Sequence, residues 1–248
     1  MGVVNVTGLR KSYGSVDALN GLSFAIERGE LFGFLGPNGA GKTSTIRILT
    51  GQIEPDAGEV RVLDTDPAAE PIETRRRVGI LPEQGSPPSF LTPREYLEFV
   101  GEVRDLDPDH VAERTDLWAE RLGFRSKLDT LTTDLSRGQQ QKVMIAQAFV
   151  HEPDVVFIDE PLANLDPLVQ EQVKEFLVAY AAEDNAVFVS THDIDVAEEI
   201  CTRVGIVADG QLVAERSLEG VTEPSLLELF LDRVTEEDAR GLPAGPAV

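Results

Sequence analysis

Residues 36–43 read G-x-x-x-x-G-K-T, and this octapeptide constrains the fold more than any other part of the chain. Its glycines allow the backbone to turn tightly, so that several N–H groups can point at one anion. A helix beginning at the end of the loop would add the positive end of its dipole. In this motif the lysine, Lys42, reaches the outer phosphates of a nucleoside triphosphate, and the hydroxyl of Thr43 can ligate Mg²⁺. The motif therefore predicts a phosphate-binding loop between a strand and a helix.

The sequence on either side of this loop supports the same prediction. Residues 31–35 are a short apolar run, typical of a buried strand, and residues 45–49 are typical of a helix. A glycine-rich turn that matched the motif by accident would not need these neighbours. The residues predicted to bind the triphosphate are Gly36, Pro37, Asn38, Gly39, Ala40, Gly41, Lys42, Thr43 and Ser44.

The chain is long enough for one large α/β domain. Of its 248 residues 42% are hydrophobic, which is sufficient for a substantial core. No run approaches the roughly 20 apolar residues that span a bilayer, and the N-terminus lacks a basic segment followed by a long apolar run. Cys201 is the only cysteine, so an internal disulfide is excluded and a reducing compartment is favoured. We therefore expect a cytoplasmic protein.

The charge of the chain narrows the choice of partners. The sequence has 22 Lys and Arg against 44 Asp and Glu, which gives a formal net charge of −22 at pH 7. Nucleic acids and anionic lipid headgroups are polyanions, so this charge argues against direct binding to either. Any attachment to a membrane is therefore expected to run through a protein partner.

The same charge also suggests a habitat. Lysine is scarce, and its positions are Lys11, Lys42, Lys127, Lys142 and Lys174. An excess of acid with little lysine suggests a halophilic protein, because concentrated salt screens the repulsion between like charges.

Short strands and turns are expected in the first part of the chain, at residues 3–9, 22–26, 31–35, 59–63 and 78–81. Two amphipathic helices are then expected at 93–100 and 108–122, with Thr92 as the cap of the first. A third helix is expected after Ser136. A helical lobe of about residues 90–140 therefore interrupts the α/β pattern.

The α/β pattern resumes at the apolar run 155–158. The elements expected after it are helices at 169–181 and 195–201 and strands at 186–190, 204–208 and 211–214. A short helix is expected around 224–231, within an extension at 216–234. Residues 235–248 include a Gly-, Pro- and Ala-rich end and are expected to be disordered.

Two acids, Asp159 and Glu160, directly follow the apolar run 155–158. Ligands of open α/β sheets sit at the carboxyl ends of the strands, where these acids would lie. Asp159 can hold Mg²⁺. Glu160 points the opposite way if the strand pleat continues, and it can then act as a general base on water. A solvated acidic pair would explain the two residues alone, but not their combination with the phosphate loop.

Three further segments complete an ordered set of motifs: Leu-Ser-Arg-Gly-Gln-Gln-Gln at 135–141, Ala-Asn-Leu-Asp at 163–166 and Ser-Thr-His-Asp at 190–193. With the phosphate loop and the acidic pair, they resemble the ATP-binding subunits of ABC (ATP-binding cassette) transporters. The resemblance covers about residues 3–215, and it implies one ATPase domain at residues 1–215. It implies an α/β fold: a P-loop NTPase core with a RecA-like mixed sheet, an N-terminal antiparallel β subdomain and an inserted helical subdomain.

The resemblance implies roles for two ring-bearing side chains. Tyr13 matches the aromatic residue that stacks on adenine, and stacking of this kind tolerates different bases. An ordinary turn tyrosine is the alternative for Tyr13. His192 matches the switch histidine that contacts the γ-phosphate, and it therefore joins Lys42 and Glu160 as a catalytic candidate. His110 and His151 are expected at the surface.

The segment at 135–139 matches the family's signature loop, formed by Leu135, Ser136, Arg137, Gly138 and Gln139. In the family this loop reaches the ATP of a second subunit, so that two subunits close head to tail around two ATP molecules. Asp166 matches a residue that communicates across the pair. Arg137 stands where the family usually has glycine, which adds a cation near the expected interface.

A second departure lies in the segment that links the core to the helical lobe. The family usually carries Gln directly after proline, whereas here Pro82 is followed by Glu83 and then Gln84. Alignment favours Glu83 as the residue that senses Mg²⁺ and the attacking water, and chemistry favours Gln84. Both alternatives stay open.

The resemblance implies a Mg²⁺-dependent ATPase that drives a transmembrane permease from the inner face of the membrane. The short helix near 224–231 and the phrase Leu81-Pro82-Glu83 resemble the drug- and polysaccharide-exporter branch, which favours export over import. A helix that merely caps the sheet is the alternative for the first feature. Two other functions are a soluble ABC ATPase not tied to transport and a regulatory cassette without turnover; the intact Asp159, Glu160 and His192 speak against the second.

Overall fold

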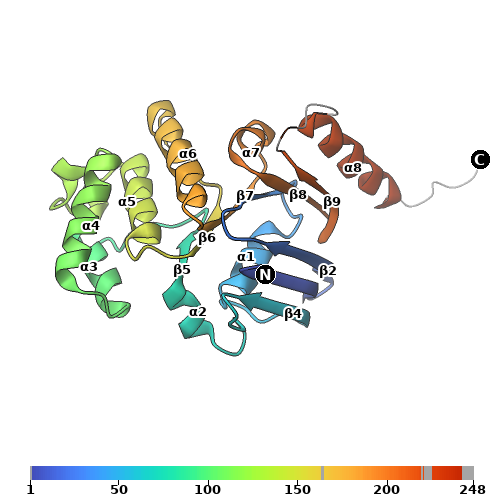
Figure 1. Ribbon diagram of the computed structural model, residues 1–248, viewed down its shortest axis with the longest axis horizontal. Coiled ribbons are helices and arrows are strands. Elements are labelled where there is room, and N and C mark those ends of the chain that lie inside the picture. Colours follow the sequence, from blue (N-terminus) through green and yellow to red (C-terminus); the bar gives the residue numbers. More distant parts are fainter. Residues whose placement is uncertain (1, 163–164, 219, 221–224, 242–248) are drawn as a thin grey trace, which may run out of the picture.

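Two β-sheets form the centre of the computed structural model, which describes residues 2–162, 165–218, 220 and 225–241 (Figure 1). The order is β2-β1-β4 in a three-stranded antiparallel sheet and β5-β6-β7-β3-β8-β9 in a six-stranded sheet. Neighbours in the larger sheet are parallel, except that β9 is antiparallel to β8. The strands are β1 Val4–Tyr13, β2 Val16–Ile26, β3 Leu31–Leu35, β4 Ala57–Val62, β5 Val78–Leu81, β6 Val155–Asp159, β7 Ala186–Thr191, β8 Arg203–Ala208 and β9 Gln211–Ser217.

The central strands β3, β6 and β7 are buried along their whole length. Parallel strands that are covered on both faces have continuous apolar sequences, so these strands were predictable from the sequence. Alternate side chains enter different cores. Leu31 and Leu35 pack with residues of the covering helices, whereas Phe32 and Phe34 pack with the small sheet and with the first helix, α1.

An inserted lobe of helices α3, α4 and α5 lies at one end of the molecule (Figure 1). In α4, Trp118 packs edge-on against Phe176 of α6, with ring centres 4.7 Å apart. Phe149 of α5 contacts the same ring at 4.8 Å, so aromatic packing joins the lobe to the core. The helices are α1 Lys42–Leu49, α2 Pro71–Arg77, α3 Pro93–Val103, α4 Pro108–Arg121, α5 Arg137–Phe149, α6 Pro167–Ala182, α7 Ile194–Ile200 and α8 Leu226–Gly241, with 3-10 turns η1 Arg125–Lys127 and η2 Thr132–Asp134.

The start of α3 follows the predicted cap. The Thr92 side chain accepts a hydrogen bond from the Glu95 N–H, Glu95 bonds back to the Thr92 N–H, and Pro93 opens the helix. Helix α2 is a difference from the sequence prediction, which expected no helix between the strands at 59–63 and 78–81. Only Thr74 of its seven residues is buried, so no apolar period marks it.

Two boundaries also differ from the prediction. Strand β1 ends at Tyr13 instead of residue 9, and β2 begins at Val16 instead of residue 22, so the two form a hairpin. The sequence did not predict these residues as strand because the tip of the hairpin is mostly exposed and has no apolar alternation. Helix α8 continues to Gly241, past the predicted end of the extension at 234, through a stretch that contains no Pro. Residues 242–248 of the tail expected to be disordered lie outside the described residues.

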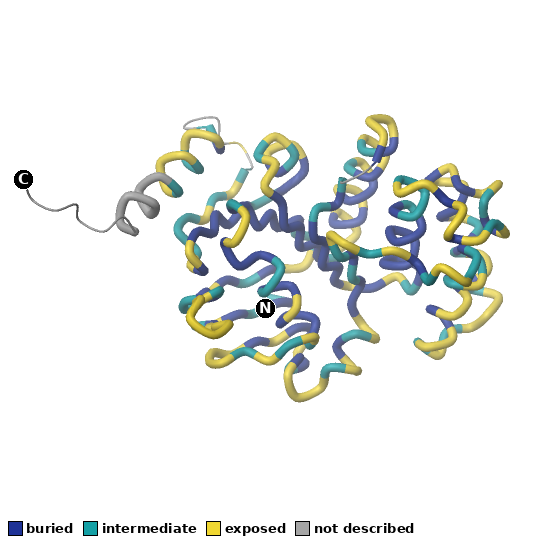
Figure 2. The backbone as a smooth tube through the Cα atoms, turned by 180° about the vertical axis from the view of Figure 1, so that it is seen from behind, coloured by how far each residue is buried: buried dark blue, intermediate teal, exposed yellow. Residues whose placement is uncertain are grey.

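Buried residues concentrate along the larger sheet and the helix faces against it (Figure 2). His151 is half-buried beside the larger sheet, contrary to the expectation of a surface position. Its Nε2 atom lies 3.1 Å from the carbonyl oxygen of Val78, because the link from α5 to β6 passes beside β5. In the part of the chain that the structure describes, no helix is both long and apolar enough to cross a membrane.

Candidate nucleotide-binding site

The phosphate loop lies between β3, which ends at Leu35, and α1, which begins at Lys42. This strand–loop–helix order agrees with the expectation from the sequence. Gly41 has a φ of 101°, and a Cβ atom there would lie 2.5 Å from the carbonyl oxygen of Ala18. A Cβ atom at Gly36 would lie 2.4 Å from the carbonyl oxygen of Val207. Only glycine fits these two positions, so tight packing against β2 and β8 fixes the loop.

Lys42 turns back over the loop from the first position of α1. Its Nζ atom donates hydrogen bonds to the carbonyl oxygens of Gly36, at 2.6 Å, and Pro37, at 3.1 Å. Burial lowers the pKa of Lys42, while the nearby carboxylates of Glu160, Asp159 and Glu83 act in the opposite direction. The buried ammonium group is thus held within the loop, where it would attract a bound anion strongly.

Thr43 and Asp159 meet beside the loop, although they are far apart in the sequence. The Thr43 hydroxyl donates a hydrogen bond of 2.8 Å to Oδ2 of Asp159. The Ser190 hydroxyl donates to Oδ1 of Asp159, because β6 and β7 pair these two residues. A hydroxyl and a carboxylate next to a phosphate loop fit Mg²⁺, which uses one or two carboxylates together with phosphate oxygens. The positioning contact of Ser190 was missed from the sequence, where its signal is a polar residue after a four-residue apolar run.

Glu160 has a φ of 55°. The strand pleat therefore ends before Glu160, whereas the sequence analysis expected it to continue through this residue. Its N–H donates to the carbonyl oxygen of Ser190 at 2.9 Å, which bends the chain beyond β6. The Nδ1 atom of His192 lies 2.7 Å from Oε1 of Glu160, and the His192 N–H donates to the same oxygen at 3.1 Å. The Thr191 hydroxyl donates to Oε2 at 3.2 Å. This left-handed conformation directs the Glu160 carboxylate to the residues at the end of β7.

These residues line one cavity of about 490 Å³, which is within the usual range for small-molecule sites. Tyr13 is at its rim, with 47% of the residue exposed and its hydroxyl 3.5 Å from that of Ser44. The lining residues are Tyr13, Ala18, Asn38, Gly39, Gly41, Lys42, Thr43, Ser44, Glu83, Asp159, Glu160 and His192.

Both alternatives for the linking segment lie near this cavity. Glu83 lines it directly. Gln84 lines an adjoining cavity of about 460 Å³ that it shares with Glu83, Thr43 and Asp159. Either side chain is therefore close to the candidate Mg²⁺ ligands.

The signature loop lies outside the cavity. Ser136 and Gln139 form a reciprocal cap at the start of α5. Leu135 is buried, Gly138 is half-buried, and the exposed Arg137 has neither an ion-pair nor a hydrogen-bond partner among the described residues. Arg137 faces a separate groove of about 680 Å³ that Glu83 and Gln84 also line.

Asp166 is likewise outside the cavity. It caps α6 by accepting from the Val169 N–H at 3.1 Å, and it lies 3.9 Å from Lys142. Ala163 and Asn164 of the same motif lie outside the described residues. A single subunit therefore gathers the phosphate loop, the acids and His192, but leaves the signature loop and Asp166 apart from them.

Comparison with known proteins gives the family of the chain. Residues 19–163, more than half of the chain, match the family described as ABC transporter. The chain is 34% identical over 214 residues to a fluoroquinolones export ATP-binding protein of Mycobacterium tuberculosis, covering 86% of this chain and 70% of that protein. It is 32% identical over 213 residues to the Nod factor export ATP-binding protein I of Ralstonia nicotianae, covering 86% and 66%. The chain belongs to the ABC transporter family.

The fold matches that of solved ATP-binding cassettes. A dimeric cassette in a post-hydrolysis state, bound to ADP and Pi, is 26% identical to the chain, with a TM-score of 0.80 over 88% of this chain and all of that one. The chain spans 66% of the length of the Ralstonia protein and 58% of that of an ABC transporter ATP-binding protein of Synechocystis.

Proposed function

We propose that the chain is the ATP-hydrolysing subunit of an ABC transporter and that it powers export through a partner permease. One observation carries the proposal: Lys42, Thr43, Asp159, Glu160 and His192 line a single cavity at the carboxyl ends of the central strands. An anion-binding loop, a pair of oxygen ligands and a candidate base are the parts that phosphoryl transfer to water requires.

The protein residues would hold the substrate at three points. Tyr13 at the rim would stack on adenine. The N–H groups of residues 36–44 and the Lys42 ammonium would bind the phosphates. Thr43 and Asp159 would hold Mg²⁺, with Glu83 or Gln84 beside them. When bound there, the metal would neutralise charge that develops on the phosphate oxygens.

Glu160 is the proposed general base. Two donors at the end of β7, the Thr191 hydroxyl and the His192 N–H, orient its carboxylate, and the Nδ1 atom of His192 contacts the same carboxylate at 2.7 Å. From this position Glu160 would accept a proton from the attacking water, and His192 would then turn its imidazole towards the γ-phosphate. Catalysis of this kind depends mostly on positioning and on charge stabilisation.

The signature loop would act in a second subunit. Ser136 and the start of α5 would present backbone N–H groups to an anion, and Arg137 adds a cation that has no ion-pair partner among the described residues. Ser136 and Arg137 lie outside the cavity of their own subunit. When two subunits close, these residues would contact the ATP bound in the cavity of the partner copy. Asp166 would couple the two sites. The existence of a dimeric cassette with the same fold supports this assembly.

A groove between α3 and α4 is the proposed contact for the permease. Its volume is about 720 Å³, and its apolar part includes Phe99, which is 52% exposed. Cytoplasmic loops of membrane proteins carry an excess of Lys and Arg, which complements an acidic groove. The acidic lining residues are Glu95, Glu98, Glu102 and Asp105. The chain would thus lie on the inner face of the membrane through its permease, with no direct contact to lipid or nucleic acid.

Two experiments test the proposal. Purified protein should bind ATP in a Mg²⁺-dependent manner and release phosphate, and Lys42→Ala should lose nucleotide binding. Isolation from detergent-solubilised membranes should recover a polytopic partner, and Phe99→Ser should weaken its recovery without changing ATP binding. A soluble ATPase would hydrolyse ATP but recover no membrane partner. Export is supported by the two export ATP-binding proteins to which the chain is similar, and transport in vesicles with the recovered permease would give the direction.

A further inference from the structure

A lysine–aspartate pair lies behind Tyr13, at the end of β1. The Nζ atom of Lys11 is 2.8 Å from Oδ1 of Asp56 and 5.8 Å from the centre of the Tyr13 ring, which it overlies. The Lys11 side chain is only 17% exposed, although it is in the outer part of the small sheet. A cation at this distance from a ring is attracted to its electron-rich face. The pair therefore lies over one face of the ring, while the ring itself borders the nucleotide cavity.

Asp56 also holds the backbone that leads to Tyr13. Its Oδ2 atom accepts a hydrogen bond from the Ser12 N–H at 2.6 Å, and its own N–H donates to the carbonyl oxygen of Arg10 at 2.9 Å. These contacts attach the residues on both sides of Lys11 to the loop before β4. The course of the chain into Tyr13 is thus set by Asp56 as well as by strand pairing.

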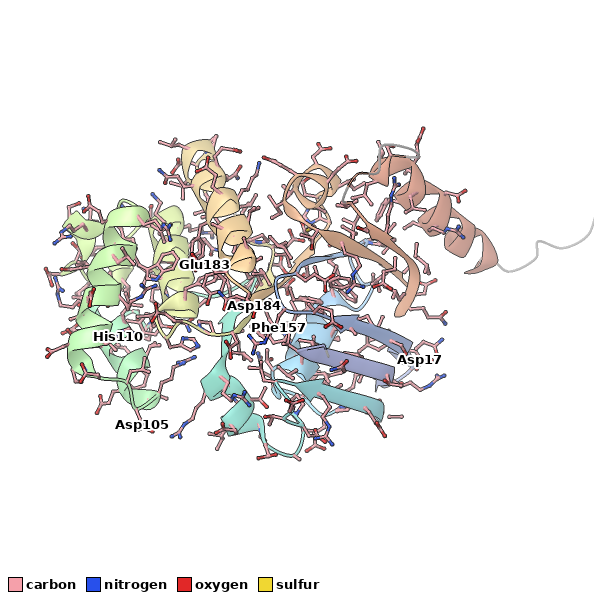
Figure 3. The ribbon with its side chains drawn as sticks, in the orientation of Figure 1. Asp17, Asp105, His110, Phe157, Glu183 and Asp184 are labelled. Carbon is pink, nitrogen blue, oxygen red and sulfur yellow. The ribbon has the colours of Figure 1, made fainter. Side chains whose placement is uncertain are left out.

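Tyr13 needs such support because it stands at the tip of a hairpin. It pairs with Val16 across a turn in which Gly14 has a φ of 63°. The Ser12 hydroxyl donates to Asp17 at 2.7 Å within the hairpin, and Figure 3 shows Asp17 on the side of the molecule away from the helical lobe. The hydroxyl contact of Tyr13 with Ser44 is long, at 3.5 Å. Contacts on the phosphate-loop side therefore hold the ring only weakly.

The charges of the pair favour this arrangement near neutral pH. The hydrogen bond to Asp56 raises the pKa of Lys11, and the hydrogen bond from Lys11 lowers the pKa of Asp56. Lys11 therefore stays cationic beside the ring.

We propose that Lys11 and Asp56 are positioning residues that hold Tyr13 in place for stacking on the nucleotide base. The pair thereby sets how strongly the site prefers a nucleotide that carries a base over a bare polyphosphate. This inference rests on the proposed function of the cavity.

Calorimetric titration with Mg·ADP and with Mg·tripolyphosphate separates the base from the phosphates. Lys11→Met should weaken ADP binding about two- to fivefold and leave tripolyphosphate binding unchanged. Lys11→Arg should bind ADP like the wild type, because Arg also pairs with a carboxylate and a ring. Lys174→Met is a matched control: Lys174 is 13% exposed and pairs with Glu171 and Glu199 on the surface, at 2.8 and 2.6 Å. It should bind both ligands like the wild type.

A double-mutant cycle with Tyr13→Ala tests whether Lys11 acts through the ring. Tyr13→Ala should weaken ADP binding about tenfold, and Lys11→Met should add nothing further in that background. Asp56→Asn should resemble Lys11→Met. Equal losses for both ligands, an undiminished Lys11 effect without the ring, or no effect on ADP would each overturn the inference. If the wild-type protein bound neither ligand, the nucleotide site itself would be wrong; if it bound both and Lys11→Met changed nothing, only the positioning role would fail.

Discussion

The Nδ1 atom of His192 lies 2.7 Å from Oε1 of Glu160, and this contact joins the residues that follow the neighbouring strands β6 and β7 in the lining of the nucleotide cavity. The His192 N–H donates to the same oxygen, so Glu160 Oε1 is held by side chain and backbone together. The carboxylate is thereby fixed before a substrate arrives.

Glu160→Gln should bind ATP with wild-type affinity and lose turnover by a factor of about 10² to 10⁴, because the amide keeps the shape but cannot accept a proton. Phosphate release and calorimetric titration with Mg·ATP measure the two properties. Glu183→Gln, an exposed acid that follows α6, serves as the control and should leave both unchanged. Turnover near the wild-type rate in Glu160→Gln would remove Glu160 as the base.

Thr191 orients the second oxygen of the same carboxylate. Its hydroxyl donates to Oε2 of Glu160 at 3.2 Å and accepts from the Asp193 N–H at 3.0 Å. Thr191→Val should therefore lower kcat by about tenfold with little change in KM, since it removes a contact that orients the base rather than one that binds ATP. Thr191→Ser keeps the hydroxyl and should restore most of the rate. A rise in KM with kcat unchanged would show that Thr191 acts in substrate binding instead.

The sequence predicted those local structures that depend on local chemistry. The phosphate loop, the buried strand before Asp159 and the Thr92 cap are each encoded within about ten residues, and the structure has them where expected. The conformation of Glu160 was not predictable in this way. Its positive φ depends on a hydrogen bond to Ser190, whose carbonyl comes from the next strand of the sheet. The sequence therefore identified Glu160 as a candidate residue but did not predict the direction in which its carboxylate points.

The hairpin that carries Tyr13 marks a second limit. Residues 10–13 and 16–18 are mostly exposed, so their strand pairing leaves no apolar alternation in the sequence. The contact between Lys11 and Asp56 joins positions 45 apart and follows only from the pairing of β1 with β4. Long-range backbone pairing of this kind decides where the base-stacking candidate lies.

His151 predicts a pH dependence of stability. Burial and the nearby charge of Arg104 lower its pKa from 6.5 to about 4, against the weaker opposing effect of its hydrogen bond to Val78. The unfolded chain then binds a proton below pH 6.5 that the folded chain does not bind until about pH 4, so stability is lost as the pH falls through this window. The loss is on the order of 3 kcal/mol at most. Urea unfolding at about pH 7 and about pH 5 should show a smaller drop for His151→Gln than for the wild type. Equal drops would mean that His151 is accessible to protons in the folded state.

Salt should stabilise the folded chain, because its net charge of −22 is repulsive in dilute buffer. Raising KCl from about 0.1 M to about 1 M shortens the Debye length from about 10 Å to about 3 Å, which screens repulsion between exposed carboxylates. We expect a higher Tm and a higher ATPase rate in the concentrated salt. Choline chloride at equal ionic strength separates general screening from a specific effect of K⁺, and sucrose separates both from a change in water activity. A protein that is fully folded and active in dilute buffer and gains nothing from either salt would contradict the adaptation to salt that its acidity and scarce lysine suggest.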